Sequence, residues 1–196
     1  MDAASLALTP MTLHSLHVAR AHVVDDETSF DQAFRACYAA RYAPLFTYLD
    51  RLTGDPDLAA DVAQEAFVRL HRRGEMPDQP AGWLAAVANN LVRDERRRVT
   101  RQLRLLTEEP GRAPVGAPAK DPAEDVERSE RITAVRAALD RLSLRDRQAL
   151  LLRHGGYSYR EIAAALGLAE TSVGTTLVRA SHAFRTAYEE MHDASE

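Results

Sequence analysis

Residues 158–180 carry a pattern that few folds accommodate, namely two short amphipathic helices joined by a tight turn. Ser158 and Glu161 stand three residues apart, the spacing of a capping box, in which each side chain bonds a backbone N–H at the start of a helix. Gly167 follows the apolar stripe of this first helix and is placed to end it, since glycine readily adopts the left-handed conformation of a helix C-cap.

The second helix of the pair is predicted to begin with Thr171 or Ser172 as its cap. Its inner face is predicted to carry Val173, Leu177 and Ala180. This arrangement is typical of a helix-turn-helix, the unit that places its second helix in the major groove of DNA. Any well-capped helical hairpin gives a similar pattern, so the motif predicts DNA binding without proving it.

Composition favours an all-α protein, because 45% of the 196 residues are hydrophobic and no stretch alternates as a strand would. Cys37 is the only cysteine, which excludes an intrachain disulfide and a cysteine-based zinc site. We expect no metal or other cofactor. The chain lacks an apolar run long enough to span a membrane and lacks a secretory signal, so we expect a cytoplasmic protein without membrane insertion.

The chain is predicted to form two small helical domains joined by a flexible linker. Residues 1–28 are weakly patterned and are predicted to be an N-terminal extension. Residues 29–106 show helical periodicity and form the first predicted domain. Residues 107–127 contain four prolines among small and acidic residues and are predicted to be the linker. Residues 128–190 form the second domain, which ends in the helix-turn-helix.

The first domain is predicted to contain three helices, because Gly54-Asp55-Pro56 and the two prolines of loop 75–80 interrupt its periodicity. The second of these helices carries Asp57, Asp61 and Glu65 at four-residue spacing, which places them on one stripe. Paired carboxylates can perform acid–base or metal chemistry. No histidine or cysteine completes such a site, so we favour a surface that meets a basic partner.

The third helix ends in a basic cluster of six arginines within twelve residues: Arg93, Arg96, Arg97, Arg98, Arg101 and Arg104. Three of them, Arg93, Arg97 and Arg101, share a helix face because they are four residues apart. Arginine binds phosphate through a planar fork of donors, so the cluster predicts contact with a nucleic-acid backbone. A solvated helix face is the simpler alternative. The net charge of −4 argues against attraction of the whole protein to nucleic acid, so any binding to a phosphate backbone is expected to depend on this local cluster.

Three stretches, at 57–70, 81–98 and 139–168, together resemble the extracytoplasmic-function group of bacterial RNA polymerase sigma factors. The resemblance extends over about residues 30–190 with the motifs in the family's order. It implies two helical domains, sigma region two and sigma region four. It also implies a protein without enzymatic activity that binds core RNA polymerase, directs it to specific promoters and assists promoter melting.

The resemblance also implies roles for individual residues. The residues that match contacts to core polymerase are Asp61, Gln64 and Glu65 for the β′ clamp, and Arg145 and Arg147 for the β flap. Those that match the helix recognising and opening the minus-ten element are Trp83, Asn90, Asp94, Arg96 and Arg97, to which the basic cluster adds Arg98 and Arg101 as DNA-binding residues. Loop 75–80 falls where the family captures a flipped, unpaired base.

Residues 171–181 match the helix that recognises the minus-thirty-five element. Its predicted polar outer face consists of Ser172, Thr175, Thr176 and Arg179. The family usually places basic residues along this helix, whereas here only Arg179 is basic. Serine and threonine lack the bidentate reach of arginine to guanine, so we expect looser recognition of the upstream element, with a contribution from DNA shape.

Three alternatives remain open from the sequence. A stand-alone helix-turn-helix transcriptional regulator would bind duplex DNA without polymerase. A small α-helical enzyme would need a converging set of catalytic groups, which the sequence does not offer. An adaptor could keep the sigma-like fold without binding DNA. The resemblance further implies an anti-sigma factor as a partner, since many members of the group are held inactive by one, but a single chain does not identify it.

Overall fold

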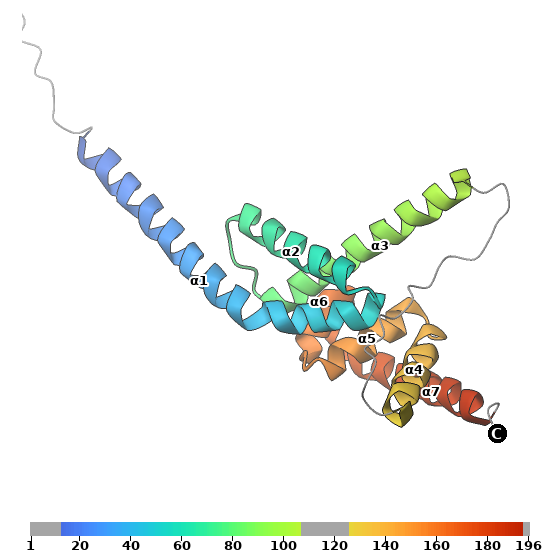
Figure 1. The fold of residues 1–196 in the computed structure, drawn as a ribbon. Coiled ribbons are helices and arrows are strands. Elements are labelled where there is room, and N and C mark those ends of the chain that lie inside the picture. Colours follow the sequence, from blue (N-terminus) through green and yellow to red (C-terminus); the bar gives the residue numbers. More distant parts are fainter. Residues whose placement is uncertain (1–12, 107–125, 194–196) are drawn as a thin grey trace, which may run out of the picture.

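The computed structural model describes residues 13–106 and 126–193, with the side chains of residues 29–102 and 131–191. These residues form seven helices and no strand (Figure 1). In order, the helices are α1 (Leu13–Thr53), α2 (Pro56–Arg73), α3 (Pro80–Leu106), α4 (Val126–Asp140), α5 (Leu144–His154), α6 (Tyr159–Leu166) and α7 (Glu170–Asp193). The predicted all-α class is confirmed.

The predicted breaks around α2 are confirmed, and each has a local cause. Asp55 caps the helix by accepting hydrogen bonds from the backbone N–H groups of Asp57 and Leu58. Pro56 suits the first helical position because its missing N–H would have no partner there. Gly74 ends the helix with a φ of 73°, in the left-handed region. The N-terminal half thus contains the three predicted helices.

The start of the helix-turn-helix is also confirmed. Ser158 and Glu161 form both hydrogen bonds of the capping box at the start of α6, and Gly167 ends α6 with a φ of 63°. The predicted cap of the next helix is wrong, because α7 begins at Glu170. The carbonyl of Ala169 already accepts the N–H of Ser172 at 2.9 Å, which places Thr171 and Ser172 inside the first turn.

Helix α1 differs from expectation in its length and its direction. It begins at Leu13, so no helix break occurs at the predicted boundary between residues 28 and 29. Pro44 lies inside α1, and the helix bends in its cyan part (Figure 1). Proline removes one backbone hydrogen bond and its ring clashes with the preceding turn, which accounts for such a bend. The predicted linker at 107–127 falls mostly outside the described residues.

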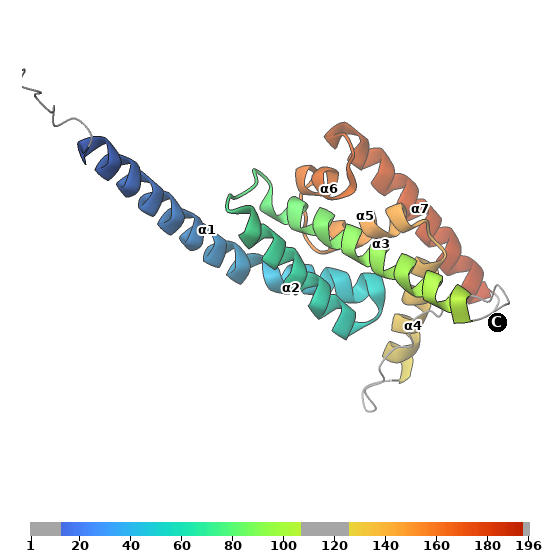
Figure 2. The same ribbon diagram turned by 90° about the horizontal axis from the view of Figure 1, so that it is seen from above.

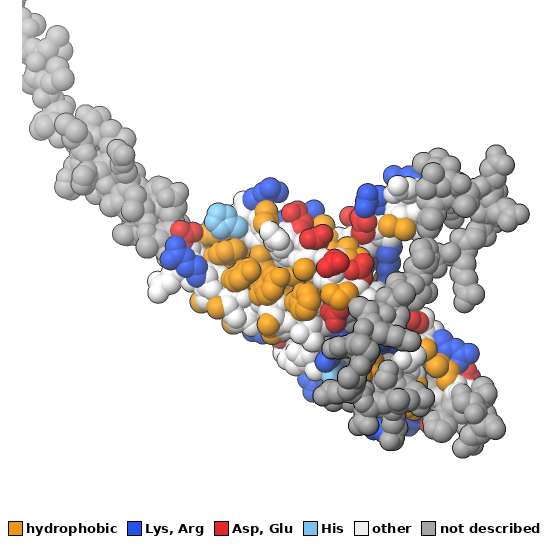
Figure 3. All heavy atoms as spheres, viewed as in Figure 1, with side chains coloured by type: hydrophobic (Ala, Val, Ile, Leu, Met, Phe, Trp, Pro, Cys, Tyr) orange, Lys and Arg blue, Asp and Glu red, His pale blue; other side chains and the backbone are white. Residues whose placement is uncertain are grey.

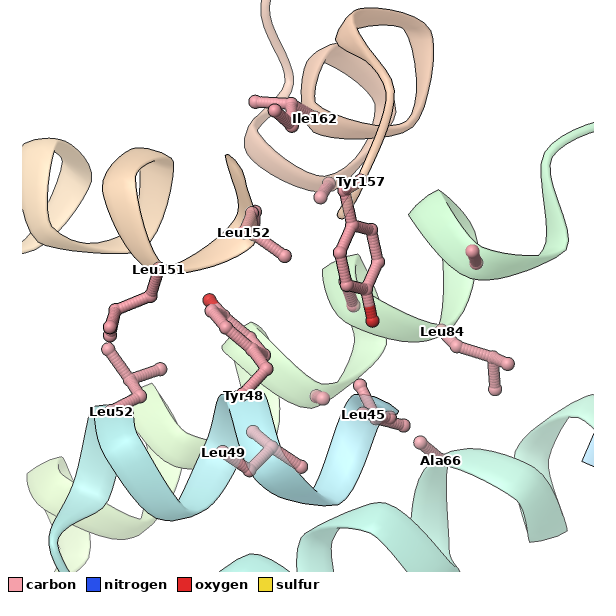
Figure 4. Packing of buried hydrophobic residues seen from close by; sticks show 14 of the residues in the cluster. Leu45, Tyr48, Leu49, Leu52, Ala66, Leu84, Leu151, Leu152, Tyr157 and Ile162 are labelled. Carbon is pink, nitrogen blue, oxygen red and sulfur yellow. The ribbon is translucent and has the colours of Figure 1, made fainter. Parts of the chain in front are cut away.

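The two halves of the chain pack against each other. We call α1–α3 the N-terminal domain and α4–α7 the C-terminal domain. Helix α6 packs on α3 and helix α5 packs on α1, whereas α4 lies against α7 (Figure 2). One hydrophobic cluster therefore crosses the boundary, with Leu45, Tyr48 and Leu52 of α1 facing Leu152 and Tyr157 (Figure 4).

Candidate nucleic-acid and partner-binding surfaces

Helix α2 separates an apolar inner face from a polar outer face. The buried residues are Ala59, Val62, Ala63, Ala66, Phe67 and Leu70. Asp61 and Gln64 are exposed, as a binding surface requires. Glu65 is half-buried and accepts a hydrogen bond of 2.8 Å from Nε of Arg69, one turn further along the helix. The carboxylate stripe expected from the sequence is therefore present on the surface of α2.

An aromatic groove lies beside this stripe, between α1 and α2. Its lining includes Phe34, Tyr38, Phe67 and His71. The ring centroids of Tyr38 and Phe67 are 4.9 Å apart, and those of Phe34 and His71 are 5.1 Å apart. Figure 3 shows hydrophobic side chains gathered over α1 and α2 next to acidic ones. The sequence showed the helical spacing of these aromatic residues but not that Tyr38 stays 44% exposed.

The predicted arginine face of α3 is exposed. Arg93, Arg97 and Arg101 are all solvent-exposed, so the face is available to a phosphate backbone. Asp94 is exposed too, and its carboxylate lies 3.9 Å from the guanidinium of Arg97. Such an exposed ion pair is weak and leaves both groups accessible to a competing ligand. The side chain of Arg104 lies outside the described residues.

Two other arginines of the cluster are engaged within the protein. Arg98 donates hydrogen bonds of 2.8 and 2.6 Å to Glu95, which raises the pKa of Arg98 and lowers that of Glu95. Arg96 points toward the end of α1, where its Nη2 lies 3.4 Å from the carbonyl oxygen of Leu52. Burial and the nearby charge of Arg147 lower the pKa of Arg96. Both residues are exposed like Arg93 and Arg97, but the sequence could not show that their guanidinium groups have partners within the protein.

Trp83, Asn89 and Asn90, in the N-terminal half of α3, divide between surface and core. Trp83 is half-buried, with the guanidinium of Arg73 5.8 Å from its ring centre. Asn90 is exposed and accepts a hydrogen bond of 3.3 Å from Arg93. Sequence reasoning missed its neighbour Asn89, which is buried and accepts a hydrogen bond of 2.6 Å from the hydroxyl of Tyr48.

The predicted outer face of the recognition helix, α7, is wrong at one residue. Thr176 does not belong to it, because the residue is only 7% exposed and its hydroxyl donates to the carbonyl of Ser172 at 2.8 Å. Thr176 lies near the inward-facing Val173 and Ala180 in helical phase, which turns it toward the core. Ser172 is half-buried and Thr175 is exposed.

The most exposed large hydrophobic residue on this helix is Val178, with 72% of its surface accessible. Arg179 lies next to it but is held by α5, since its Nη2 donates to Asp146 at 2.6 Å. Burial opposes ionisation of Asp146, but hydrogen bonds from Arg179 and Ser143 outweigh it and lower the pKa of the carboxyl. Arg179 is therefore a structural ion-pair partner as well as a surface cation.

The two predicted flap residues lie in different environments. Arg145 is exposed. The side chain of Arg147 is only 14% exposed and donates a hydrogen bond of 2.8 Å to the carbonyl oxygen of Leu52 at the end of α1. It also pairs with Asp140. The structure thus places Arg145 where a partner can reach it and places Arg147 between the two domains.

Comparison with known proteins matches both domains. Residues 37–102 match Sigma-70 region 2, and residues 132–181 match Sigma-70, region 4. The ECF RNA polymerase sigma factor SigL of Mycobacterium tuberculosis is 33% identical over 172 residues, which cover 80% of this chain and 89% of SigL. The chain belongs to the ECF sigma factors. As a sigma factor it is a promoter-specific initiation factor for RNA polymerase. The family matches therefore favour this function over that of a stand-alone transcriptional regulator.

Further relatives agree with this family. SigX of Bacillus subtilis is 26% identical over 152 residues, which cover 74% of this sigma factor and 78% of SigX. The sigma factor RpoE in complex with the anti-sigma factor NepR from Bartonella quintana shares the fold, with a TM-score of 0.61, 20% identity, and coverage of 81% of this chain and 98% of RpoE. CnrH in complex with the cytosolic domain of CnrY gives a TM-score of 0.57, 22% identity, and coverage of 88% and 96%.

Within the described residues, no helix is both long and apolar enough to cross a membrane. Nor does the same part of the chain hold a cluster of three or more histidine, cysteine, aspartate or glutamate side chains suited to a metal ion.

Proposed function

We propose that this sigma factor binds core RNA polymerase mainly through the outer face of α2. Asp61 and Gln64 are exposed beside the aromatic groove, so one surface offers both charge and apolar area. Interfaces of this kind gain affinity from buried aromatic residues and gain orientation from the surrounding charges. The resemblance assigns this surface to the β′ clamp, and the exposed Arg145 to the β flap.

Promoter opening is assigned to α3 and the loop that precedes it. The observation that carries this proposal is the exposed face of Arg93, Arg97 and Arg101, which continues along one helix from Trp83. Arginines on such a face bind phosphates, while an aromatic ring near an unpaired base offers a stacking surface. The guanidinium of Arg73 lies 5.8 Å from the centre of the Trp83 ring, within cation–π distance, which supports a role of this ring as a binding face.

Recognition of the upstream element is assigned to Thr175 and Val178 on α7, with Arg179 contributing through its charge. An exposed aliphatic side chain on a recognition helix suits the methyl group of thymine in the major groove. Because Arg179 is paired with Asp146, bidentate recognition of guanine would require breaking a 2.6 Å hydrogen bond. These contacts support a modest sequence preference at the upstream promoter element, for sites that are rich in thymine.

Run-off transcription with purified core polymerase tests the proposed function. The sigma factor should convert core enzyme, which alone starts non-specifically, into one that starts at defined positions on a genomic template library. A variant with Arg93, Arg97 and Arg101 replaced by alanine should still bind core polymerase but should lose most of the defined starts. Core binding without any defined start by the native chain would instead support the adaptor alternative.

We further propose that the protein acts in the cytoplasm, where polymerase works, and has no catalytic activity of its own. An anti-sigma factor is a proposed partner, because the related fold of RpoE was captured with the anti-sigma factor NepR. Co-purification of the tagged native chain from its own host, followed by mass spectrometry, should recover polymerase subunits. An anti-sigma partner should appear there in the fraction that lacks polymerase.

A further inference from the structure

The recognition segment of α7, residues 171–181, carries only one basic side chain, that of Arg179. This side chain lies with Thr175 and Val178 along one hollow on the surface of α7. It therefore belongs to the face of the helix that the proposed function presents to DNA. Any bidentate recognition of guanine by this segment depends on where the guanidinium of Arg179 lies.

A carboxylate of a neighbouring helix holds this guanidinium. Helix α5 packs against α7 (Figure 2), and Nη2 of Arg179 donates to Oδ1 of Asp146 at 2.6 Å. The side chain of Asp146 is only 12% exposed, whereas that of Arg179 is 62% exposed. The pair thus has one partner fixed within the protein and one that can turn toward a ligand.

Asp146 is itself fixed by the cap of α5. The hydroxyl of Ser143 accepts the backbone N–H of Asp146 at 3.2 Å and donates to its Oδ2 at 2.7 Å. Each carboxylate oxygen therefore has its own partner, Oδ1 with Arg179 and Oδ2 with Ser143. Because the first turn of α5 determines the position of this carboxylate, Asp146 holds Arg179 at a defined place beside α5.

The release of Arg179 from Asp146 has a cost. A mostly buried carboxylate that loses its cation keeps an uncompensated charge, which is strongly unfavourable. This cost is comparable to the discrimination that a bidentate contact between arginine and guanine provides. A guanine in the major groove therefore gains little by attracting Arg179 away from α5.

The surrounding charges also favour release once the carboxylate is removed. Arg145 lies within electrostatic reach of Asp146. Without the negative charge between them, the like charges of Arg145 and Arg179 would repel each other. A neutral residue at position 146 therefore favours a guanidinium that turns away from α5 and toward DNA.

We propose that Asp146 is a positioning residue that determines the base preference at the upstream element, because it holds Arg179 against α5 and away from guanine. The inference rests on the proposed recognition of that element by α7. A residue outside the recognition helix then decides between an upstream site that is recognised through Thr175 and Val178 and one that includes guanine.

Transcription from templates with a randomised upstream element tests this role. Core polymerase is combined with the full-length parent or variant chain, and each template keeps the minus-ten region of a start that the parent defines. Sequencing of the transcribed templates gives the base preference at each upstream position. Asp146→Ala should prefer guanine about tenfold at one position where the parent does not, as expected for one bidentate contact. Asp146→Asn keeps the size of the side chain and an acceptor, so it should show a smaller preference for the same base.

Two further variants separate this role from an effect on stability. Asp146→Ala combined with Arg179→Ala should lose the new guanine preference, because that preference depends on the released guanidinium. Ser143→Ala is the matched control, since it removes the cap of α5 but keeps both members of the ion pair. It should retain the base preference of the parent. A loss of stability alone would lower the amount of transcript without favouring one base.

Three results would overturn the inference. An unchanged base preference in both Asp146 variants would show that the pair does not limit recognition. A gain on all templates alike would show that only the charge of Asp146 matters. A guanine preference in the parent that both variants lose would show that Asp146 supports base recognition by Arg179. In each case the defined starts of the parent leave the proposed function intact, whereas a parent without defined starts would refute the proposed function and this role together.

Discussion

Replacing Tyr48 with phenylalanine isolates one buried hydrogen bond at the centre of the molecule. Tyr48 is 2% exposed and its hydroxyl donates to Oδ1 of Asn89 at 2.6 Å. The change removes the donor and leaves the Asn89 oxygen buried and unpaired, which costs about 1–3 kcal/mol. Part of this cost is offset, because folding of the phenylalanine variant no longer removes a tyrosine hydroxyl from water. We therefore expect a net loss of about 1–2 kcal/mol, or a melting temperature lower by roughly 2–8 °C.

Urea denaturation followed by circular dichroism measures the loss, and Asn89→Leu supplies the partner variant. When both groups are removed, the Asn89 acceptor no longer exists, so the double variant should be more stable than the sum of the single effects predicts, by about 1 kcal/mol. The carbonyl of Ala165 loses its 3.4 Å hydrogen bond from Nδ2 of Asn89 in both variants that carry Asn89→Leu, so this loss cancels in the comparison. Additive effects within error would show that the hydroxyl and the amide do not interact. A Tyr48→Phe variant as stable as the parent would refute the assignment of a stabilising hydrogen bond.

Three other predictions concern the surface and the pH dependence. Lysine at both Asp61 and Glu65 should weaken core-polymerase binding by roughly tenfold with the fold intact, and an unchanged affinity in a titration would remove both residues from the interface. Arg97→Ala should reduce the salt slope of promoter binding by about one, whereas the exposed Arg136→Ala on α4 should not; equal slopes would argue against a phosphate contact. The lowered pKa of Asp146 means that its ionised form stabilises the native state above the unfolded pKa of about 3.9, and that this stabilisation disappears as pH falls through the lower native pKa. Denaturation at several pH values should find Asp146→Asn less stable than the parent at pH 6 but close to it near pH 2, and equal stability at pH 6 would contradict the pairing.

Local signals were the part of the fold that the sequence could predict. Ser158 and Gly167 each act on the backbone within four residues, so their roles as caps depend on little else. Thr176 was misplaced because one residue of helical phase decides between surface and core, and threonine is found in both. The start of α7 was predicted wrongly for a different reason: Thr171 and Ser172 are common cap residues, but the helix already begins at Glu170.

Contacts between distant segments were the part that could not be predicted. Asn89 and Asn90 are identical in type and adjacent, and contacts with Tyr48 of α1 and Ala165 of α6 make Asn89 a core residue. The burial of Arg147 could not be predicted either, because the carbonyl oxygen that it binds belongs to Leu52, which lies far away in sequence. The resemblance to sigma factors located the candidate surfaces of α2, α3 and α7, but it did not reveal that the two domains pack together.

The shared core has a consequence for how the protein is made. Tyr48 and Leu52 lie in α1, which leaves the ribosome first, but Leu152 and Tyr157, which belong to the same cluster, follow about 100 residues later. At about 5–20 residues per second, the nascent N-terminal helices wait roughly 5–20 s with apolar surface exposed. During that interval the growing chain is a substrate for chaperones and prone to aggregation. Fragments that end near Leu106 should for the same reason self-associate when expressed alone.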